Sequence, residues 1–252
     1  MHPCPVFIGG SPKSGTSVIG ALLARATGQA FSKDPFWSVL RDDRGGFLLP
    51  DVLEGKLALE DFVGRYRAYF AAGVVKDPDF VFLLAQLQRM FPASAQVFVV
   101  RDPRENIRSI LSRLRIRGDL EDLGPDERRM LGAEEGWRAV LAGRGLCLDG
   151  ANYVARLAQR WVQGVESYLA ARDTIHLVRY EDFASDRAGS IASLADALGM
   201  RLTTDIGDRL EWRHRPHARG GVPTDDFFGQ RNLATIDGIC APHLSRFGYG
   251  QS

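Results

Sequence analysis

Residues 6–26, VFIGGSPKSGTSVIGALLARA, join a short apolar run to an amphipathic pattern through a loop of small and hydroxyl-bearing residues. The run Val6-Phe7-Ile8 has the composition of a strand that is buried on both faces of a parallel sheet. After the loop, apolar side chains recur at the i, i+3, i+4 and i+7 positions of a helix: Ile19, Leu22, Leu23 and Ala26. This stretch therefore predicts a strand, a loop over residues 11–17 and a helix, in that order.

The same alternation of apolar runs and helical patterns continues along the chain. Further strands are predicted at residues 73–75, 97–100 and 175–178, and further helices at residues 107–114, 153–168 and 191–198. Strands that alternate with helices are typical of α/β proteins. We expect a doubly wound, mostly parallel sheet with helices on both faces, in a single domain over residues 1–252.

Three segments interrupt this pattern. Residues 42–55 contain glycine and proline, and residues 213–229 are rich in arginine, histidine, glycine and proline, so we expect both as loops. Long irregular segments in a compact domain are often functional lids. Residues 117–150 are polar, contain glycine and show only partial helical patterning.

Composition and charge are those of an ordinary globular protein. Hydrophobic residues make up 45% of the 252 residues, and a net charge of +1 gives no overall attraction to nucleic acid or membrane. Three widely spaced cysteines without a CxxC pair indicate neither a disulfide framework nor a cysteine-built metal site. No apolar run approaches the roughly 18 residues of a membrane span, and the N-terminus lacks the features of a signal peptide. We therefore expect a reduced, cytoplasmic protein that binds neither nucleic acid nor membrane.

The loop over residues 11–17, SPKSGTS, has the composition of a phosphate-binding turn. The backbone N–H groups of Gly15, Thr16 and Ser17 would be the unpaired donors of the helix start, and Lys13 would add a positive charge. The spacing differs from the nucleotide-binding pattern GxxxxGK[ST], because Thr16 rather than lysine follows Gly15. The alternative interpretation is a plain strand-to-helix turn with a surface lysine.

A second polar site follows the strand predicted at residues 97–100. Arg101 leaves the carboxyl end of this strand, where ligands of open α/β sheets bind, and Ser109 lies about two turns into the next helix. Together they offer a guanidinium group and a hydroxyl group to an anion. The alternative is a structural Arg–Asp pair at the helix start. For the other basic residues here we favour a solvated face: Arg104, Arg113, Arg115 and Arg117.

A third polar site follows the strand predicted at residues 175–178. Tyr180 could lay its ring against a base or a sugar, while Glu181 and Asp182 could cap the following helix or orient basic neighbours. The alternative interpretation is a helix start with two favourable acidic residues.

In this order, the three sites resemble those of the sulfotransferases that use 3′-phosphoadenosine 5′-phosphosulfate (PAPS). In that family a PKSGT-type loop binds the 5′-phosphosulfate, and here it reads Pro12-Lys13-Ser14-Gly15-Thr16-Ser17. An arginine after a central strand and a serine eight residues later bind the 3′-phosphate, which points to Arg101 and Ser109. A Tyr-Glu-Asp stretch approaches the adenosine, which points to Tyr180. With the chain end FGQRNLATIDGICAPHLSRFGY, the resemblance runs from residue 6 to about residue 249 and implies a P-loop-like nucleotide-binding core.

The resemblance implies transfer of a sulfuryl group from PAPS, which leaves 3′-phosphoadenosine 5′-phosphate (PAP) and needs no metal. Lys13 and Lys76 are the residues implied to meet the charge that develops on the leaving phosphate. The acceptor also needs a general base, and the ungapped match to the carboxylate that some relatives use is Asp34. The alternative for Asp34 is a turn-forming Asp-Pro with a solvated carboxylate. Four further residues are reserve candidates for the base: Asp51, Glu54, His214 and His217.

The sequence departs from the best-known cytosolic sulfotransferases at several positions. Their lysine-x-histidine pair reads Lys76-Asp77-Pro78 here, so the histidine is missing. Their Arg-Lys-Gly loop is matched only loosely, by Arg219-Gly220-Gly221, in which Arg219 and Gly220 are predicted to contact the donor. The alternatives are a contact with an anionic acceptor and a solvated loop. Their dimer motif is not evident, so no oligomeric state is predicted.

Three functions fit these observations. The first is a PAPS-dependent sulfotransferase that acts on a hydroxyl or amine of a small molecule or glycan. The second is a P-loop kinase for a small metabolite, which explains the loop and the parallel sheet but not the displaced lysine. The third is a non-catalytic member of the fold that keeps the nucleotide pocket. Binding of PAP without metal would favour the first, and magnesium-dependent binding of ATP would favour the second.

Overall fold

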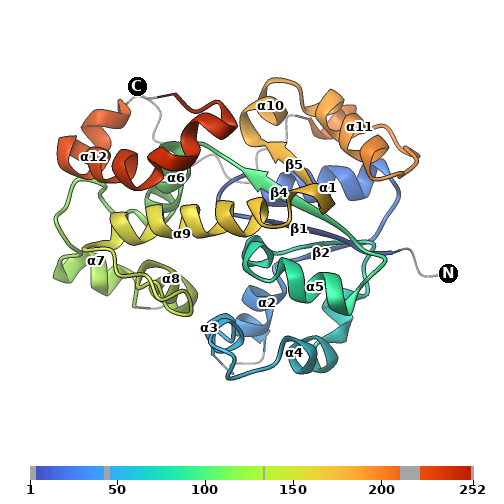
Figure 1. Cartoon of the computed structure of the whole chain (residues 1–252), viewed down its shortest axis with the longest axis horizontal. Helices are drawn as coiled ribbons and strands as arrows, with labels where there is room; N and C mark the ends of the chain where they lie inside the picture. The colour runs from blue at the N-terminus through green and yellow to red at the C-terminus, as the bar shows by residue number, and fades with distance from the viewer. Residues whose placement is uncertain (1–3, 43–45, 133, 211–221, 251–252) are drawn as a thin grey trace.

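A five-stranded sheet, in which all strands run parallel in the order β2-β3-β1-β4-β5, forms the centre of the molecule (Figure 1). The computed structural model describes residues 4–42, 46–132, 134–210 and 222–250. The strands are β1 (Val6–Gly10), β2 (Phe31–Lys33), β3 (Val74–Lys76), β4 (Ala95–Val100) and β5 (Ile175–Arg179). Ile8 pairs with Lys76 on one side and with Val97 on the other, which sets the register of the three central strands. The predicted α/β fold with a mostly parallel sheet is confirmed.

The three central strands β3, β1 and β4 are almost completely buried, which explains their mostly apolar sequences. Strand β2 was not predicted. It has only three half-buried residues, Phe31-Ser32-Lys33, at the edge of the sheet, and so short a run carries no periodic signal.

Helices cover both faces of the sheet. Since side chains alternate along each strand, neighbouring residues of β1 enter different cores. Val6 and Ile8 pack into a core with helices α1 (Thr16–Ala26) and α11 (Arg187–Ala197), whereas Phe7 packs on the opposite face. Figure 1 shows α9 (Tyr153–Leu169) crossing in front of the sheet, with α12 (Thr224–Leu244) beside it. The remaining α-helices are α2 (Pro35–Asp42), α3 (Leu49–Leu53), α4 (Leu59–Arg65), α5 (Leu84–Met90), α6 (Pro103–Leu114), α7 (Pro125–Met130), α8 (Glu135–Leu141) and α10 (Tyr180–Ser185).

Short 3₁₀ helices complete the chain, at η1 (Arg67–Phe70), η2 (Pro78–Phe82), η3 (Arg172–Thr174), η4 (Gly207–Arg209) and η5 (Ser245–Phe247). The most important for the site is η2, because it follows β3 directly and packs against β1 and α9.

The prediction of a loop at residues 42–55 is wrong in part. Helix α3 occupies its second half, since Pro50 suits the first turn of a helix and Leu49 and Val52 are buried. The loop predicted at residues 213–229 overlaps the start of α12, and residues 211–221 lie outside the described residues. The partial helical pattern at residues 117–150 is confirmed by α7 and α8. None of the helices that the structure describes is long and apolar enough to cross a lipid bilayer.

Candidate active site

The polar residues predicted from the sequence gather at the carboxyl end of the sheet. Lys13 follows β1, Asp34 follows β2, Lys76 ends β3, Arg101 follows β4 and Tyr180 follows β5. Because all five strands are parallel, these positions lie at one edge, where ligands of open α/β sheets bind.

The β1–α1 loop at residues 11–15 is a tight turn with two left-handed residues. Lys13 has a φ of 70° and Gly15 has a φ of 87°. Gly15 is the N-cap of α1, and no side chain caps the first turn of this helix. In the first turn the Val18 N–H donates to the Gly15 carbonyl, whereas the N–H groups of Thr16 and Ser17 have no backbone acceptor among the described residues. This helix start can therefore receive an anion.

Arg101 and Tyr180 come together over this loop. The guanidinium carbon of Arg101 lies 4.5 Å from the centre of the Tyr180 ring, and an Arg101 Nη donates a 3.0 Å hydrogen bond to the Lys13 carbonyl. The Tyr180 ring lies against Gly15, since a Cβ added there would be 2.5 Å from a ring carbon. The Nε of Arg101 is buried and has no hydrogen-bond partner among the described residues. The structure thus places the Arg101 guanidinium group against the loop, with its Nε–H not used in a hydrogen bond among the described residues.

Asn106 is a residue of this site that the sequence reasoning missed. It is 1% exposed, and its amide donates to the Pro12 carbonyl at 2.7 Å and to the Ser14 hydroxyl at 3.0 Å. The available signal was a polar side chain on the apolar face of α6, one turn before the buried Ile110. Ser109 lies on the same helix and is half-buried, but no hydrogen bond between described residues joins it to the loop or to Arg101.

Lys76 and Asp34 form an ion pair between the ends of β3 and β2. The Lys76 Nζ lies 2.5 Å from an Asp34 carboxylate oxygen, and their side chains are 5% and 17% exposed. The backbone N–H of Asp34 also donates to the Lys76 carbonyl. Asp34 takes a left-handed conformation with a φ of 53°, as aspartate in a turn can. The solvated carboxylate considered as an alternative for Asp34 is therefore wrong.

Behind this pair lies a buried polar cluster at the start of η2. The carboxylate of Asp77 accepts from the backbone N–H groups of Phe36 and Asp79, so it caps η2 and holds the first turn of α2. Burial, together with the neighbouring carboxylates of Asp79 and Asp34, raises the pKa of Asp77 well above its usual value. Asp79 is in turn ion-paired with the buried Arg160 of α9.

Glu181 links the ends of β4 and β5 to the end of the chain. It accepts from the backbone N–H of Asp102 at 2.9 Å and from the Tyr249 hydroxyl at 2.8 Å. The solvated position predicted for Arg104 is wrong, because Arg104 is 5% exposed and ion-paired with Asp237 of α12 at 2.6 Å. Arg115 and Arg117 are exposed as predicted, and Arg113 is partly exposed beside Glu134.

The reserve residues lie elsewhere or outside the described residues. Asp51 and Glu54 belong to α3 and its end, and Lys56 at 2.5 Å lowers the pKa of the Glu54 carboxyl. Arg219, Gly220, His214 and His217 fall outside the residues that the structure describes. Over the described residues, no group of three or more His, Cys, Asp or Glu side chains is arranged to hold a metal ion.

Comparison with known proteins agrees with this architecture. The model of the sulfotransferase family matches residues 52–205, which is more than half of the chain. This chain belongs to the sulfotransferase family. The matched segment includes Lys76, Arg101 and Tyr180 but begins after the β1–α1 loop. No curated protein matches the sequence.

Several crystal structures of sulfotransferases are similar in fold. STF1 from Mycobacterium tuberculosis H37Rv is 16% identical, with a TM-score of 0.58, over 96% of this chain and 77% of that chain. STF9 from Mycobacterium avium is 16% identical, with a TM-score of 0.56, over 99% of this chain and 78% of that chain. The sulfotransferase domain from the curacin biosynthetic pathway is 14% identical, with a TM-score of 0.54, over 99% of both chains. At these identities the likeness concerns the fold alone.

Proposed function

We propose that this sulfotransferase takes the sulfuryl group from PAPS and transfers it to a hydroxyl or amine of a small-molecule or glycan acceptor, leaving PAP. The observation that carries this proposal is the meeting of the β1–α1 loop with Arg101 and Tyr180 at the carboxyl end of the sheet. A helix start, a guanidinium group and an aromatic ring at one place suit a ligand with two anionic groups and a base.

The residues of the described chain fit this donor. The N–H groups at the start of α1, with Lys13, Thr16 and Ser17, would hold the 5′-phosphosulfate. Ser14, predicted for the same role, is buried, and its hydroxyl accepts from Asn106. Arg101 keeps a buried Nε without a partner among the described residues, and one of its Nη atoms lies 3.5 Å from the Glu105 carboxylate. In the proposal Arg101 and Ser109 bind the 3′-phosphate and Tyr180 contacts the adenosine. Arg219 and Gly220 remain a prediction for the same site.

When bound, PAPS supplies a sulfuryl group on a good leaving group, and the protein supplies positioning and charge. The S–O bond to the phosphate breaks as the new bond from sulfur to the acceptor oxygen or nitrogen forms. Lys13 and Lys76 stabilise the negative charge on the departing phosphate oxygen. Asp34, whose carboxylate lies with Lys76 at the same edge of the sheet, takes the proton from the acceptor.

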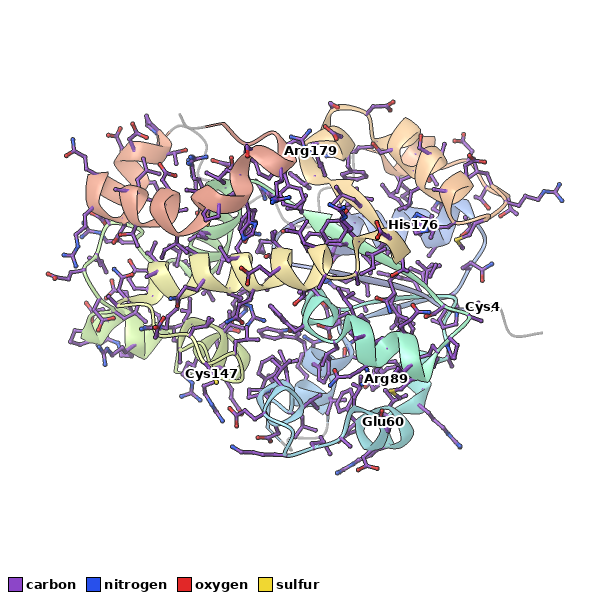
Figure 2. The ribbon with its side chains drawn as sticks, in the orientation of Figure 1. Cys4, Glu60, Arg89, Cys147, His176 and Arg179 are labelled. Atoms are coloured by element: carbon purple, nitrogen blue, oxygen red, sulfur yellow. The ribbon has the colours of Figure 1, made fainter. Side chains whose placement is uncertain are left out.

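The donor assignment is tested first by the melting temperature with PAP, with ATP and magnesium, and with neither. A ligand that binds the folded state raises the melting temperature. We expect a rise with PAP in the absence of metal, and a rise at least three-fold smaller for Lys13→Ala and Arg101→Ala. Arg89→Ala is the matched control, because Arg89 is an exposed arginine on α5. Figure 2 shows it far from Arg179, which ends β5 at the edge of the sheet where the candidate site lies.

The other outcomes separate the alternatives. A rise only with ATP and magnesium would contradict the proposal and favour the small-metabolite kinase. A rise with PAP, without transfer from PAPS to any of a panel of phenols, alcohols, amines and sugars, would favour a non-catalytic nucleotide-binding member. No rise with either ligand would contradict the donor site itself. We further propose that the protein acts in the cytoplasm without a metal and without contact to nucleic acid or membrane.

A further inference from the structure

The backbone of Lys13 is held in a conformation that its side chain disfavours. Its φ of 70° lies in the left-handed region, where residues other than glycine are strained. Gly15, two residues later, has a φ of 87° and carries no such penalty. Strain of this kind persists where surrounding contacts determine the backbone. The contacts that hold the backbone of Lys13 at this φ angle therefore set the conformation of the loop.

Two side chains from the β4–α6 segment hold the two peptide groups that flank Lys13. The Asn106 amide donates to the Pro12 carbonyl at 2.7 Å, on the N-terminal side of Lys13. Arg101 donates to the Lys13 carbonyl at 3.0 Å, on the C-terminal side. Because each peptide group is planar, fixing both carbonyls fixes the φ and ψ angles between them.

Asn106 also reaches past Lys13 to the next residue. Its amide nitrogen lies 3.0 Å from the Ser14 hydroxyl oxygen, so one amide group spans the loop from Pro12 to Ser14. Both Asn106 and Ser14 are buried, at 1% and 0% exposed, so water does not compete for these hydrogen bonds. The helix that carries Asn106 is anchored by the buried Ile107 and Ile110.

We propose that Asn106 is a positioning residue that holds the β1–α1 loop in the conformation required for binding the donor. The C=O and N–H of a trans peptide point in opposite directions, so the bond to the Pro12 carbonyl also sets the direction of the Lys13 N–H. Asn106 thereby shapes the anion site without being a ligand of the anion. The role rests on the proposed function only for the identity of the nucleotide.

The first test compares PAP affinity with stability in three variants. Asn106→Ala removes both hydrogen bonds, and Asn106→Asp keeps the volume but has no N–H to donate. The control is Asn232→Ala, because Asn232 is also buried and also donates to two backbone oxygens, of Gly118 and Leu120. We expect both Asn106 variants to bind PAP at least tenfold more weakly, and Asn232→Ala to bind it as the wild type does. Equal affinities for Asn106→Ala and Asn232→Ala would overturn the proposal.

The second test uses no nucleotide. Amide hydrogen exchange is measured by mass spectrometry on the unliganded protein, in peptides that cover residues 9–20. We expect faster exchange in this segment for Asn106→Ala and wild-type exchange for Asn232→Ala, at a temperature equally far below each melting point. Unchanged exchange in Asn106→Ala, or an equal increase in both variants, would overturn the role of Asn106. Wild-type protein that fails to bind PAP would contradict the proposed donor, while the exchange result would still decide the role of Asn106.

Discussion

At the scale of single residues, the ion pair between Lys76 and Asp34 is the contact whose disruption should lower stability most. The Lys76 side chain is 5% exposed, so its ammonium group depends on Asp34 at 2.5 Å for a counter-charge. Asp34 is 17% exposed and keeps more access to water. A buried charge that loses its partner is strongly destabilising, whereas a partly hydrated one is less so. The two residues should therefore respond unequally to substitution.

Asp34→Asn should lower the free energy of unfolding by about 3 kcal/mol, because it leaves the Lys76 charge buried and unpaired. Lys76→Met should cost less, and the double variant should be more stable than Asp34→Asn alone, because methionine removes the uncompensated charge. Chemical denaturation at pH 7 measures all three variants. If the two single effects simply add, the ion pair does not have the role that its geometry indicates.

Asp34→Asn also tests the general base. PAP should bind to Asp34→Asn, while transfer to an acceptor that the wild type uses should fall by about 100-fold or more. Transfer that survives in Asp34→Asn would show that another group takes the proton.

At the scale of elements, the start of α1 contacts the start of α10, because the Tyr180 ring lies against Gly15. A methyl group at Gly15 would lie 2.5 Å from the Tyr180 ring, and the φ of 87° disfavours any side chain there. Gly15→Ala should therefore push Tyr180 away from Arg101 as well as strain the backbone. We expect it to destabilise the protein by about 2 kcal/mol and to weaken PAP binding at least tenfold.

Gly55→Ala is the control for this prediction. Gly55 has a left-handed φ of 72°, but an added Cβ there meets nothing within 4 Å. The strain in Gly55→Ala should lower stability by about 1 kcal/mol and leave PAP binding unchanged. Isothermal titration calorimetry separates the two variants, and equal PAP affinities would contradict the role given to the contact between Gly15 and Tyr180.

The elements also show what the sequence could predict. The positions of Lys13, Arg101 and Tyr180 followed from strand ends, because polar residues after buried runs of a parallel sheet must lie at one edge. Strand β2 and helix α3 were missed because three and five residues are too few to establish a period. Asn106 was missed because its role depends on how α6 is turned against the loop, which the sequence does not state.

At the scale of the whole molecule, contacts between distant segments escaped prediction for a related reason. Arg104 is paired with Asp237 across 133 residues, and a basic helix with acidic neighbours looks the same in sequence whether it is solvated or covered. Lys76 and Asp34 were each predicted as site residues, but their pairing became visible only when β2 proved to lie beside β3.

The C-terminal segment reaches the candidate site through a hydrogen bond between Tyr249 and Glu181. Tyr249 donates to a Glu181 carboxylate oxygen, and the other oxygen of Glu181 accepts the N–H of Asp102, next to Arg101. Burial, with the Glu181 carboxylate, raises the pKa of Tyr249, so its hydroxyl stays protonated and can donate. This one hydroxyl therefore connects the chain end to the ends of β4 and β5.

Tyr249→Phe should lower the melting temperature by about 5 °C, since a hydrogen bond to a charged group contributes about 2 kcal/mol and 1 kcal/mol shifts a domain of this size by about 2–4 °C. PAP binding should weaken a few-fold, because Glu181 then supports Asp102 and Arg101 less firmly. Tyr168→Phe is the control, as its ring stays stacked on Phe98 at 4.8 Å and lies outside this network. If Tyr249→Phe lowers the melting temperature but leaves PAP affinity at the wild-type value, the chain end stabilises the fold without shaping the site.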